Sequence, residues 1–449
     1  MTGDASLFSA PTASPGWARR HALPAGLLVL IFLEQVLFGA EQPRLALIAA
    51  VAQLLLLAAV LLLMRSPRLP GAVFSLPFAG VIAVGMIQLL PLAALGNPAW
   101  SFSGQAAIVS LDPWATRVEL VKLAGLGALY TVALQVGRDD RWRPLFLRGL
   151  VLGAILYGVW AFIDRIVSPQ EFLGLSRMAY TDRLTGSFLS ANTAGSLFGV
   201  YVVLAVAALA HALGRLRAEA GANRAAGLAP PAALFLVSAT CLLQTASRGA
   251  GAATLICLLL AVAVLAWDRS RRDRMSGAAV AVLLGLLGLA VAVYLLSGER
   301  ITDRMGRTDA DLGERTQLYA AYWRAFRDAP WLGYGLGAFH QINALVASPA
   351  DPAGFADVGA AHNVYLQWLV EAGAVGSALM LAGVLAAAAA CAAGFARHRQ
   401  ARPYVLAALG ALSLLALHGL TDFALQIPSI SALLTALVGA AHGACLRRA

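Results

Sequence analysis

The chain has 449 residues, of which 60% are hydrophobic and only 12% are charged, and its mean hydropathy is +0.75. A soluble domain carries about a quarter charged residues, so the composition excludes an ordinary soluble protein and indicates a polytopic membrane protein. The net charge of +10 does not by itself indicate nucleic-acid binding, because the basic residues must first be placed relative to the membrane. We expect no nucleic-acid partner.

Apolar runs of about 17 to 25 residues, long enough to cross a bilayer, follow a polar N-terminal tail over residues 1–23. They predict an all-α integral membrane protein with about twelve spans. Only the turn Ser247-Arg248-Gly249 divides the seventh span from the eighth. The predicted spans are 24–40, 45–64, 72–95, 119–137, 146–167, 187–213, 229–246, 250–267, 277–297, 363–395, 404–420 and 424–445.

The arginines predict the orientation of these spans. With an even number of spans, both termini and five connections lie on one side, and these seven segments hold 20 basic residues against 6 acidic ones. Positive segments of this kind stay in the cytoplasm. We therefore expect a multi-pass membrane protein with both termini cytoplasmic. The organisation is a tail at 1–23, nine spans over 24–297, an extracytoplasmic loop at 298–362, three spans over 363–445 and a tail at 446–449.

The loop at 298–362 is long compared with the other polar connections, and long connections of this kind are usually functional. Residues 313–328 are expected to form an amphipathic helix, because Tyr319, Tyr322, Trp323 and Phe326 recur at helical spacing. Such an aromatic stripe indicates a buried contact, and stacking on sugar rings is the alternative interpretation. The glycines of the string WLGYGLGAF that follows predict a tight backbone turn.

Arginines at the outer ends of spans form the first set of candidate site residues. Arg183 precedes the sixth span, and Arg248 lies in the short turn between the seventh and eighth. Guanidinium groups bind diphosphate through bidentate, charge-assisted hydrogen bonds, whereas the alternative role is contact with phospholipid headgroups. An enzyme outside the cell has no nucleotide sugar, so we expect a donor activated on a lipid, such as a polyprenyl diphosphate.

His362 is the second candidate, at the membrane boundary where the tenth span begins. Its imidazole could accept or orient the proton of a sugar hydroxyl near neutral pH; the alternative is a helix-capping or interfacial histidine. No His, Cys, Asp or Glu cluster has the spacing of metal ligands, and the four cysteines lie in apolar runs. We therefore expect no metal and no cofactor.

Four strings stand out in order along the chain: DRLTGSFLSANTAG (182–195), TASRGA (245–250), RTQLYAAYWRAFRDAPWLGYGLGAF (315–339) and AHNVYLQWLVEAGAVG (361–376). Together they resemble the O-antigen ligase/polymerase family of bacterial membrane glycosyltransferases, and LDPWATR at 111–117 is also similar. The third and fourth strings are the most specific. In one respect the chain differs from the family, since Ser190 stands where many members carry asparagine.

The resemblance implies a GT-C-like fold in the bacterial inner membrane, with the loop at 298–362 in the periplasm as the catalytic loop. It also implies inverting, metal-independent transfer of a glycan from undecaprenyl diphosphate to an acceptor hydroxyl. The acceptor would be lipid A–core or a growing polysaccharide, for an O-antigen ligase or an O-antigen or exopolysaccharide polymerase. His362 would act on the acceptor hydroxyl, and Arg183 and Arg248 would hold the donor diphosphate. The implied substrate-binding residues are Arg315, Asn363, Asn192 and Tyr319.

Two alternatives stay open at this point. A branch of the same family transfers glycans to protein side chains, and its motifs are the same. A transporter or flippase of lipid-linked sugars would show intramembrane charges along a pathway. The spans here carry few such charges, chiefly Glu34 and Asp164, which favours the enzyme.

Overall fold

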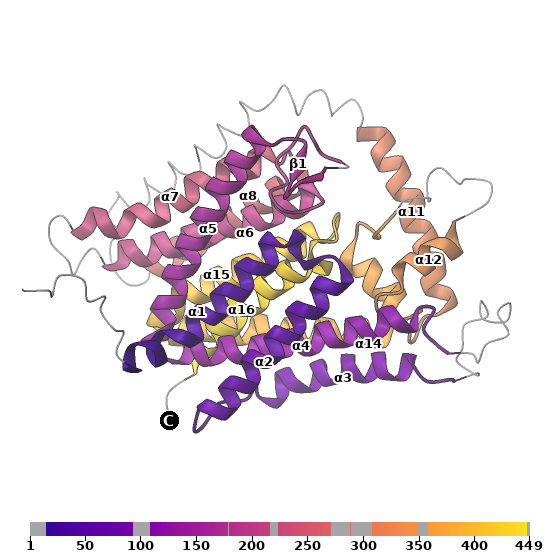
Figure 1. The fold of residues 1–449 in the computed structure, drawn as a ribbon, viewed down its shortest axis with the longest axis horizontal. Coiled ribbons are helices and arrows are strands. Elements are labelled where there is room, and N and C mark those ends of the chain that lie inside the picture. Colours follow the sequence, from indigo (N-terminus) through magenta and orange to yellow (C-terminus); the bar gives the residue numbers. More distant parts are fainter. Residues whose placement is uncertain are drawn as a thin grey trace, which may run out of the picture.

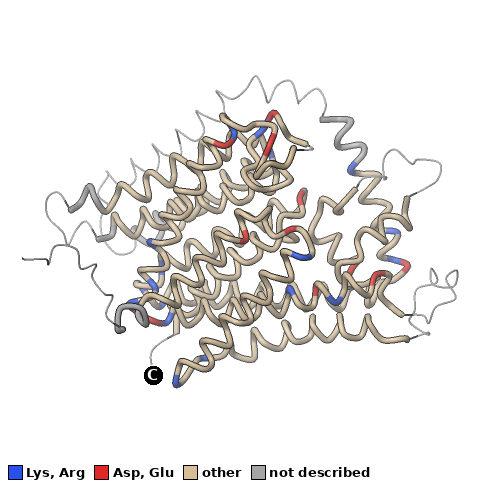
Figure 2. The backbone as a smooth tube through the Cα atoms, in the orientation of Figure 1, with Lys and Arg blue, Asp and Glu red and all other residues tan. Residues whose placement is uncertain are grey.

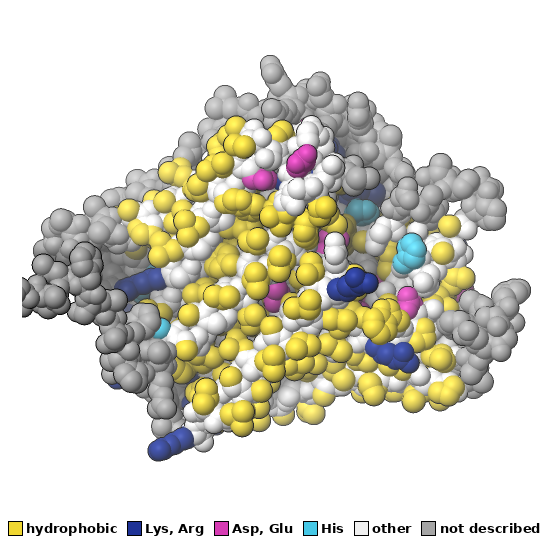
Figure 3. Space-filling model, in the orientation of Figure 1, with side chains coloured by type: hydrophobic (Ala, Val, Ile, Leu, Met, Phe, Trp, Pro, Cys, Tyr) yellow, Lys and Arg dark blue, Asp and Glu magenta, His cyan; other side chains and the backbone are white. Residues whose placement is uncertain are grey.

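The computed structural model describes residues 15–92, 108–177, 179–215, 223–270, 288, 308–347 and 358–446. In these parts of the chain the structure is almost entirely helical, with one two-stranded hairpin. Eight of the helices are long and apolar enough to cross a membrane. On the face shown in Figure 3, hydrophobic side chains cover most of the surface over the helices. The protein is an all-α integral membrane protein.

The elements follow one another along the chain as Figure 1 shows. The first half contains α1 (Pro15–Val36), η1 (Phe38–Ala40), α2 (Pro43–Leu63), α3 (Ala72–Gln88), α4 (Pro113–Arg138), α5 (Trp142–Val167), β1 (Glu171–Phe172), β2 (Leu175–Ser176) and α6 (Ala191–Arg215). The second half contains α7 (Asn223–Gln244), α8 (Arg248–Ser270), α11 (Thr308–Asp328), α12 (Phe339–Val346), α14 (Val364–Arg397), η3 (Arg399–Ala401), α15 (Arg402–His418), η4 (Ala424–Gln426) and α16 (Pro428–Cys445).

Eleven of the twelve predicted spans correspond to helices in the described residues, eight of them long and three shorter. The ninth, at 277–297, lies outside the described residues except for residue 288. The third predicted span was too long, because α3 ends at Gln88 and Pro91 cannot continue the backbone hydrogen bonding of a helix. The sixth helix starts later than predicted, at Ala191, because Ser190 caps it by accepting from the Asn192 N–H.

Two sets of neighbouring helices form the bundle, as the packing contacts and Figure 1 show. Helix α6 is the most enclosed span and packs against α7, α8 and α15. Helix α4 packs against α2 and α16, and small residues bring α4 and α16 close together. A Cβ on Gly443, for example, would lie 2.1 Å from the carbonyl oxygen of Leu134.

Helices α11 and α12 lie at one end of the bundle, beyond the ends of α3 and α14 (Figure 1). Their own small core contains Tyr322, Phe339 and Ile342, and the hydroxyl of Tyr322 donates to Asn343 Oδ1 at 2.7 Å. The predicted amphipathic helix is thereby confirmed, although it starts earlier, at Thr308.

The glycine-rich turn after α11 fixes this end to α14. The N–H groups of Tyr334 and Gly335 donate to the carbonyls of Val370 and Glu371 at 2.9 and 3.0 Å. The two backbones are so close that a Cβ on Gly333, whose φ is 66°, would lie 2.6 Å from the Glu371 carbonyl carbon. The predicted tight turn is therefore present, and it positions α11 beside the start of α14.

Candidate active site

The connection between α15 and α16 carries a buried carboxyl group. Asp422 is completely shielded from solvent, and its Oδ2 accepts a hydrogen bond from the Ala424 N–H at 3.2 Å. The side chain of Asn192, in the first turn of α6, also bonds to it, whereas its Oδ1 has no hydrogen-bond partner in the described part of the chain. Burial raises the pKa of Asp422 to about 7, although these hydrogen bonds and the charge of Arg315 oppose the rise. The group can therefore exchange a proton near neutral pH.

His418, at the end of α15, joins this connection to two other helices. Its Nδ1 lies 2.7 Å from Ser196 Oγ on α6 and 3.9 Å from Asp422 Oδ2. On α8, a Cβ added to Gly249 would come within 2.8 Å of His418 Cδ2. The close approach of α8 to α15 thus depends on glycine directly after Arg248.

Helix α11 contributes two side chains from one face, because residues four apart lie above one another on a helix. Arg315 Nη1 donates to the carbonyl oxygen of Thr421 at 3.1 Å, next to Asp422. The hydroxyl of Tyr319 donates to the carbonyl oxygen of His362 at 2.9 Å. Helix α11 therefore bridges the loop that carries Asp422 and the segment that carries His362.

His362 adopts a backbone conformation that is uncommon for a residue with a side chain, with φ at 50°. Its ring meets the Phe423 ring edge-on at a centroid distance of 5.3 Å, so it lies beside the residue after Asp422. Its Nδ1 is buried and has no hydrogen-bond partner among the residues described. Burial, together with the charge of Arg315, lowers the pKa of His362 to about 4. At neutral pH the imidazole is uncharged and can accept a hydrogen bond.

The two predicted diphosphate-binding arginines lie on elements that adjoin this cluster. Arg248 is the first residue of α8, one position before the glycine that contacts His418. The segment of Arg183 is tied to the same end of the bundle, because the Leu184 N–H donates to the carbonyl of Gln244 at the end of α7. The Arg183 guanidinium lies over the Tyr180 ring, 5.3 Å from its centroid.

Asn363 has a structural role at the start of α14. Its side-chain oxygen accepts from the N–H groups of Tyr365 and Leu366, which makes it the N-cap of α14. The cap fixes where α14 begins, directly after His362. The amide is thus engaged with the helix, and its predicted contact with substrate stays a prediction.

Asp422, His418 and Ser196 were missed by the sequence analysis. A signal was available, since the string HGLTD at 418–422 places a histidine near the end of the eleventh predicted span and an aspartate in the short connection that follows, on the predicted periplasmic side. What the string does not reveal is that packing of α6, α8 and α15 removes these side chains from water.

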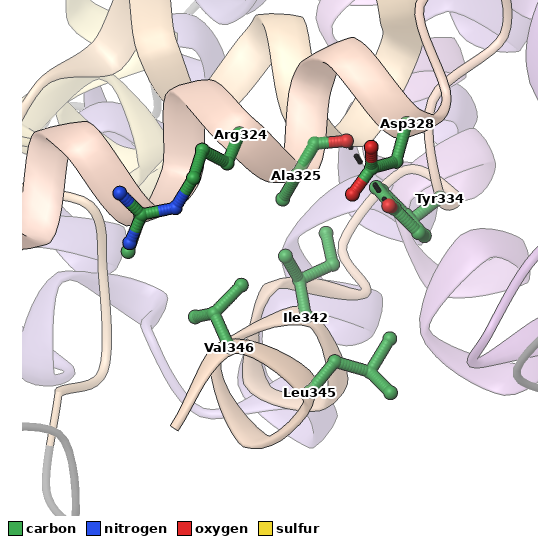
Figure 4. Close-up of a pocket in the computed structure, with 8 residues that line it drawn as sticks. Arg324, Ala325, Asp328, Tyr334, Ile342, Leu345 and Val346 are labelled. Atoms are coloured by element: carbon green, nitrogen blue, oxygen red, sulfur yellow. Dashed lines mark hydrogen bonds between the residues drawn. The ribbon is translucent and has the colours of Figure 1, made fainter. Parts of the chain in front are cut away.

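A cavity of about 370 Å³ lies away from this cluster, between α11 and α12. Figure 4 shows Arg324 and Asp328 above the apolar side chains of Ile342, Leu345 and Val346. None of the predicted site residues lines it.

Groupings of His, Cys, Asp and Glu that could hold a metal ion do not occur among the described residues. The expectation of metal-independent chemistry stays a prediction that only an assay can test.

Residues 233–381 match the family model described as O-antigen ligase. This stretch contains Arg248, Arg315, Tyr319, His362 and Asn363, whereas Arg183, Asn192 and Asp422 lie outside it. No curated protein matches the chain.

Proposed function

Because residues 233–381 match the family model described as O-antigen ligase, we propose that this chain is a member of that family and a glycosyltransferase of the bacterial inner membrane. It transfers a glycan from undecaprenyl diphosphate to an acceptor hydroxyl on the periplasmic face, as an O-antigen ligase or a polymerase. The family supports lipid-linked polysaccharide substrates. Both termini lie in the cytoplasm, so that α11, α12 and the cluster around Asp422 face the periplasm. This orientation rests on the distribution of arginines: Figure 2 shows where the charged residues of the described chain lie.

One observation carries the proposal. Side chains from α6, α11, the segment before α14 and the α15–α16 connection lie around two buried polar atoms without hydrogen-bond partners in the described residues, His362 Nδ1 and Asp422 Oδ1. Buried polar atoms of this kind are rare in folded proteins unless a ligand or water completes them. A sugar hydroxyl that donates to one of these atoms would supply the missing partner.

In the proposed reaction the acceptor oxygen attacks the anomeric carbon of the donor. The new glycosidic C–O bond forms as the bond from the anomeric carbon to the phosphate oxygen breaks, with inversion, and undecaprenyl diphosphate leaves. His362 accepts the hydrogen bond of the attacking hydroxyl and orients it. With a pKa of about 4 it is a weak proton acceptor, whereas Asp422, with a pKa of about 7, suits that role better.

The cationic side chains act on the donor in this scheme. Arg183 and Arg248 hold the diphosphate and stabilise the negative charge that develops on the leaving oxygen, a form of electrostatic stabilisation. Arg315 adds positive charge beside Asp422 and His362. Tyr319 holds the His362 backbone, and Asn192 orients the Asp422 carboxyl group.

Glycan profiling of a deletion strain tests the function. The strain is complemented with wild type, His362→Ala or the control His340→Ala, which alters an exposed histidine on α12. Lipopolysaccharide and secreted polysaccharide are blotted separately, with protein levels matched.

Loss of glycan on the lipid A–core band with His362→Ala, and not with His340→Ala, supports a ligase. Loss of long chains, or single repeats on the core, supports a polymerase. Full restoration by His362→Ala would contradict the proposed role of His362.

A further inference from the structure

The hairpin between α5 and α6, labelled β1 in Figure 1, has an unusual turn. Phe172 pairs with Leu175, so Leu173 and Gly174 form a two-residue loop, with φ of 49° and 75°. Loops with positive φ at both positions favour asparagine or glycine first, and leucine is poorly suited to this conformation. The turn geometry therefore does not explain Leu173, which points to a role for its side chain.

The tip is apolar and exposed, while the base of the hairpin is firmly packed. Leu173 and Leu175 are 64% and 57% exposed, and a Cβ on Gly174 would meet no atom within 4 Å. Phe172, in contrast, is buried and contacts the rings of Phe38 and Trp160 at 4.8 and 5.6 Å. The two leucines are thus presented on a rigid support.

The hairpin follows a span, α5, that exposes many apolar side chains. Exposed apolar side chains recur along one face of this span up to its last residue, at Leu152, Leu156, Val159, Ile163, Ile166 and Val167. From the exposed Arg148 to Val167 the helix rises about 28 Å at 1.5 Å per residue, close to the roughly 30 Å of a bilayer's hydrocarbon core. The hairpin begins at Glu171, directly beyond this edge.

We propose that the tip formed by Leu173, Gly174 and Leu175 inserts into the bilayer leaflet on the side of the candidate active site. The tip contacts the acyl chains of that leaflet. Glu171 and Ser176, which flank the tip and are exposed, lie at the level of the headgroups. The apolar surroundings of the side chain thus explain why leucine occupies a turn position whose positive φ is unfavourable for it.

The hairpin is connected to the segment that carries Arg183. The backbone N–H of Arg177 donates to the Gln170 carbonyl at 2.7 Å and closes the hairpin. The guanidinium of Arg177 forms an ion pair with Asp164 at 2.5 Å. The same guanidinium donates to the Gly186 carbonyl at 3.0 Å. Through Arg177, an inserted tip holds residues 179–186 at headgroup depth, where a lipid-linked diphosphate also lies. This consequence rests on the proposed function, whereas the insertion does not.

Spin-label accessibility tests the insertion directly. Leu173→Cys and the control Leu345→Cys, an exposed leucine on α12, are made in a Cys445→Ala background because the other three cysteines are buried. Each protein is labelled with a nitroxide in liposomes. We expect dissolved oxygen to relax the label at position 173 more than a water-soluble nickel chelate does, and the reverse at position 345. Equal or greater nickel accessibility at position 173 would overturn the proposal.

The effect on the donor is measured with Leu173→Asn, which places a favoured turn residue at the tip. We expect the KM for lipid-linked donor to rise severalfold while kcat stays close to wild type, with no such change in Leu345→Asn. An unchanged KM would refute the depth-setting role. If wild-type protein transferred no glycan, the proposed function would fail, and the spin-label result would still decide the insertion.

Discussion

Asp422→Asn is expected to remove most of the transfer activity and yet stabilise the protein at alkaline pH. The folded state raises the pKa of Asp422 from 3.8 to about 7, so it favours the protonated carboxyl group. The stability that this group contributes is fully present below about pH 4 and is lost as the pH rises through about 7. At 1.36 kcal/mol per pKa unit the loss amounts to about 4 kcal/mol. Asparagine avoids this loss because it carries no charge.

The activity of the variant should fall by about 10²- to 10⁴-fold, the usual contribution of a general base. Wild-type kcat should rise with pH through about 7, as Asp422 loses its proton, and the residual activity of Asp422→Asn should lack this step.

Two measurements on purified protein check the reasoning. Thermal unfolding in detergent between pH 5 and pH 9 should give a Tm advantage for Asp422→Asn that grows up to about pH 8 and then levels off, because Asp422 is by then ionised in both the folded and the unfolded protein. Transfer assays over the same range should give the loss of activity and the changed pH profile. A Tm difference that is independent of pH would refute the raised pKa, and near wild-type activity in the variant would refute the role in proton transfer.

Three further substitutions test individual contacts. Tyr319→Phe removes the hydrogen bond to the His362 carbonyl and should lower kcat by about 2- to 10-fold. An unchanged kcat would show that this bond does not contribute to catalysis. Gly249→Ala places a Cβ 2.8 Å from His418 Cδ2 and should reduce transfer strongly. The control Gly227→Ala, where a Cβ meets no atom within 4 Å, should leave transfer unchanged. Equal activities of the two variants would exclude a functional role for the close approach of Gly249 to His418. Asn363→Ala should destabilise α14 by about 1 kcal/mol, whereas Asn363→Asp keeps the cap. Full activity of Asn363→Asp would show that the residue acts only as a helix cap, and a loss of activity in this variant would support substrate binding.

The spans and the helix α11 could be predicted because their signals are local. Runs of apolar residues gave the helices of the described bundle, and helical spacing of aromatic residues gave α11. The end of α3 was missed because hydropathy continues beyond Gln88, whereas the backbone hydrogen bonding stops near Pro91.

The candidate site could be predicted only in part, for a physical reason. His362 and Arg248 stand out in the sequence because a charged or titratable residue at the end of an apolar run is costly without partners. Asp422 does not stand out, because an aspartate in a short polar connection is ordinary. Its burial and its contact with Asn192 arise from tertiary packing, which no local pattern encodes.

Reconstitution from purified components tests the proposed glycosyl transfer and the role of His362. Purified wild type, His362→Ala and His340→Ala are placed in liposomes with an undecaprenyl-diphosphate-linked glycan and a lipid A–core or glycan acceptor. Both the product and the released undecaprenyl diphosphate are quantified. We expect equal amounts of product and released undecaprenyl diphosphate for wild type and His340→Ala, and almost none of either for His362→Ala. Transfer by His362→Ala at the wild-type rate would contradict the role of His362, and no transfer by wild type to any of these acceptors would contradict the proposed function.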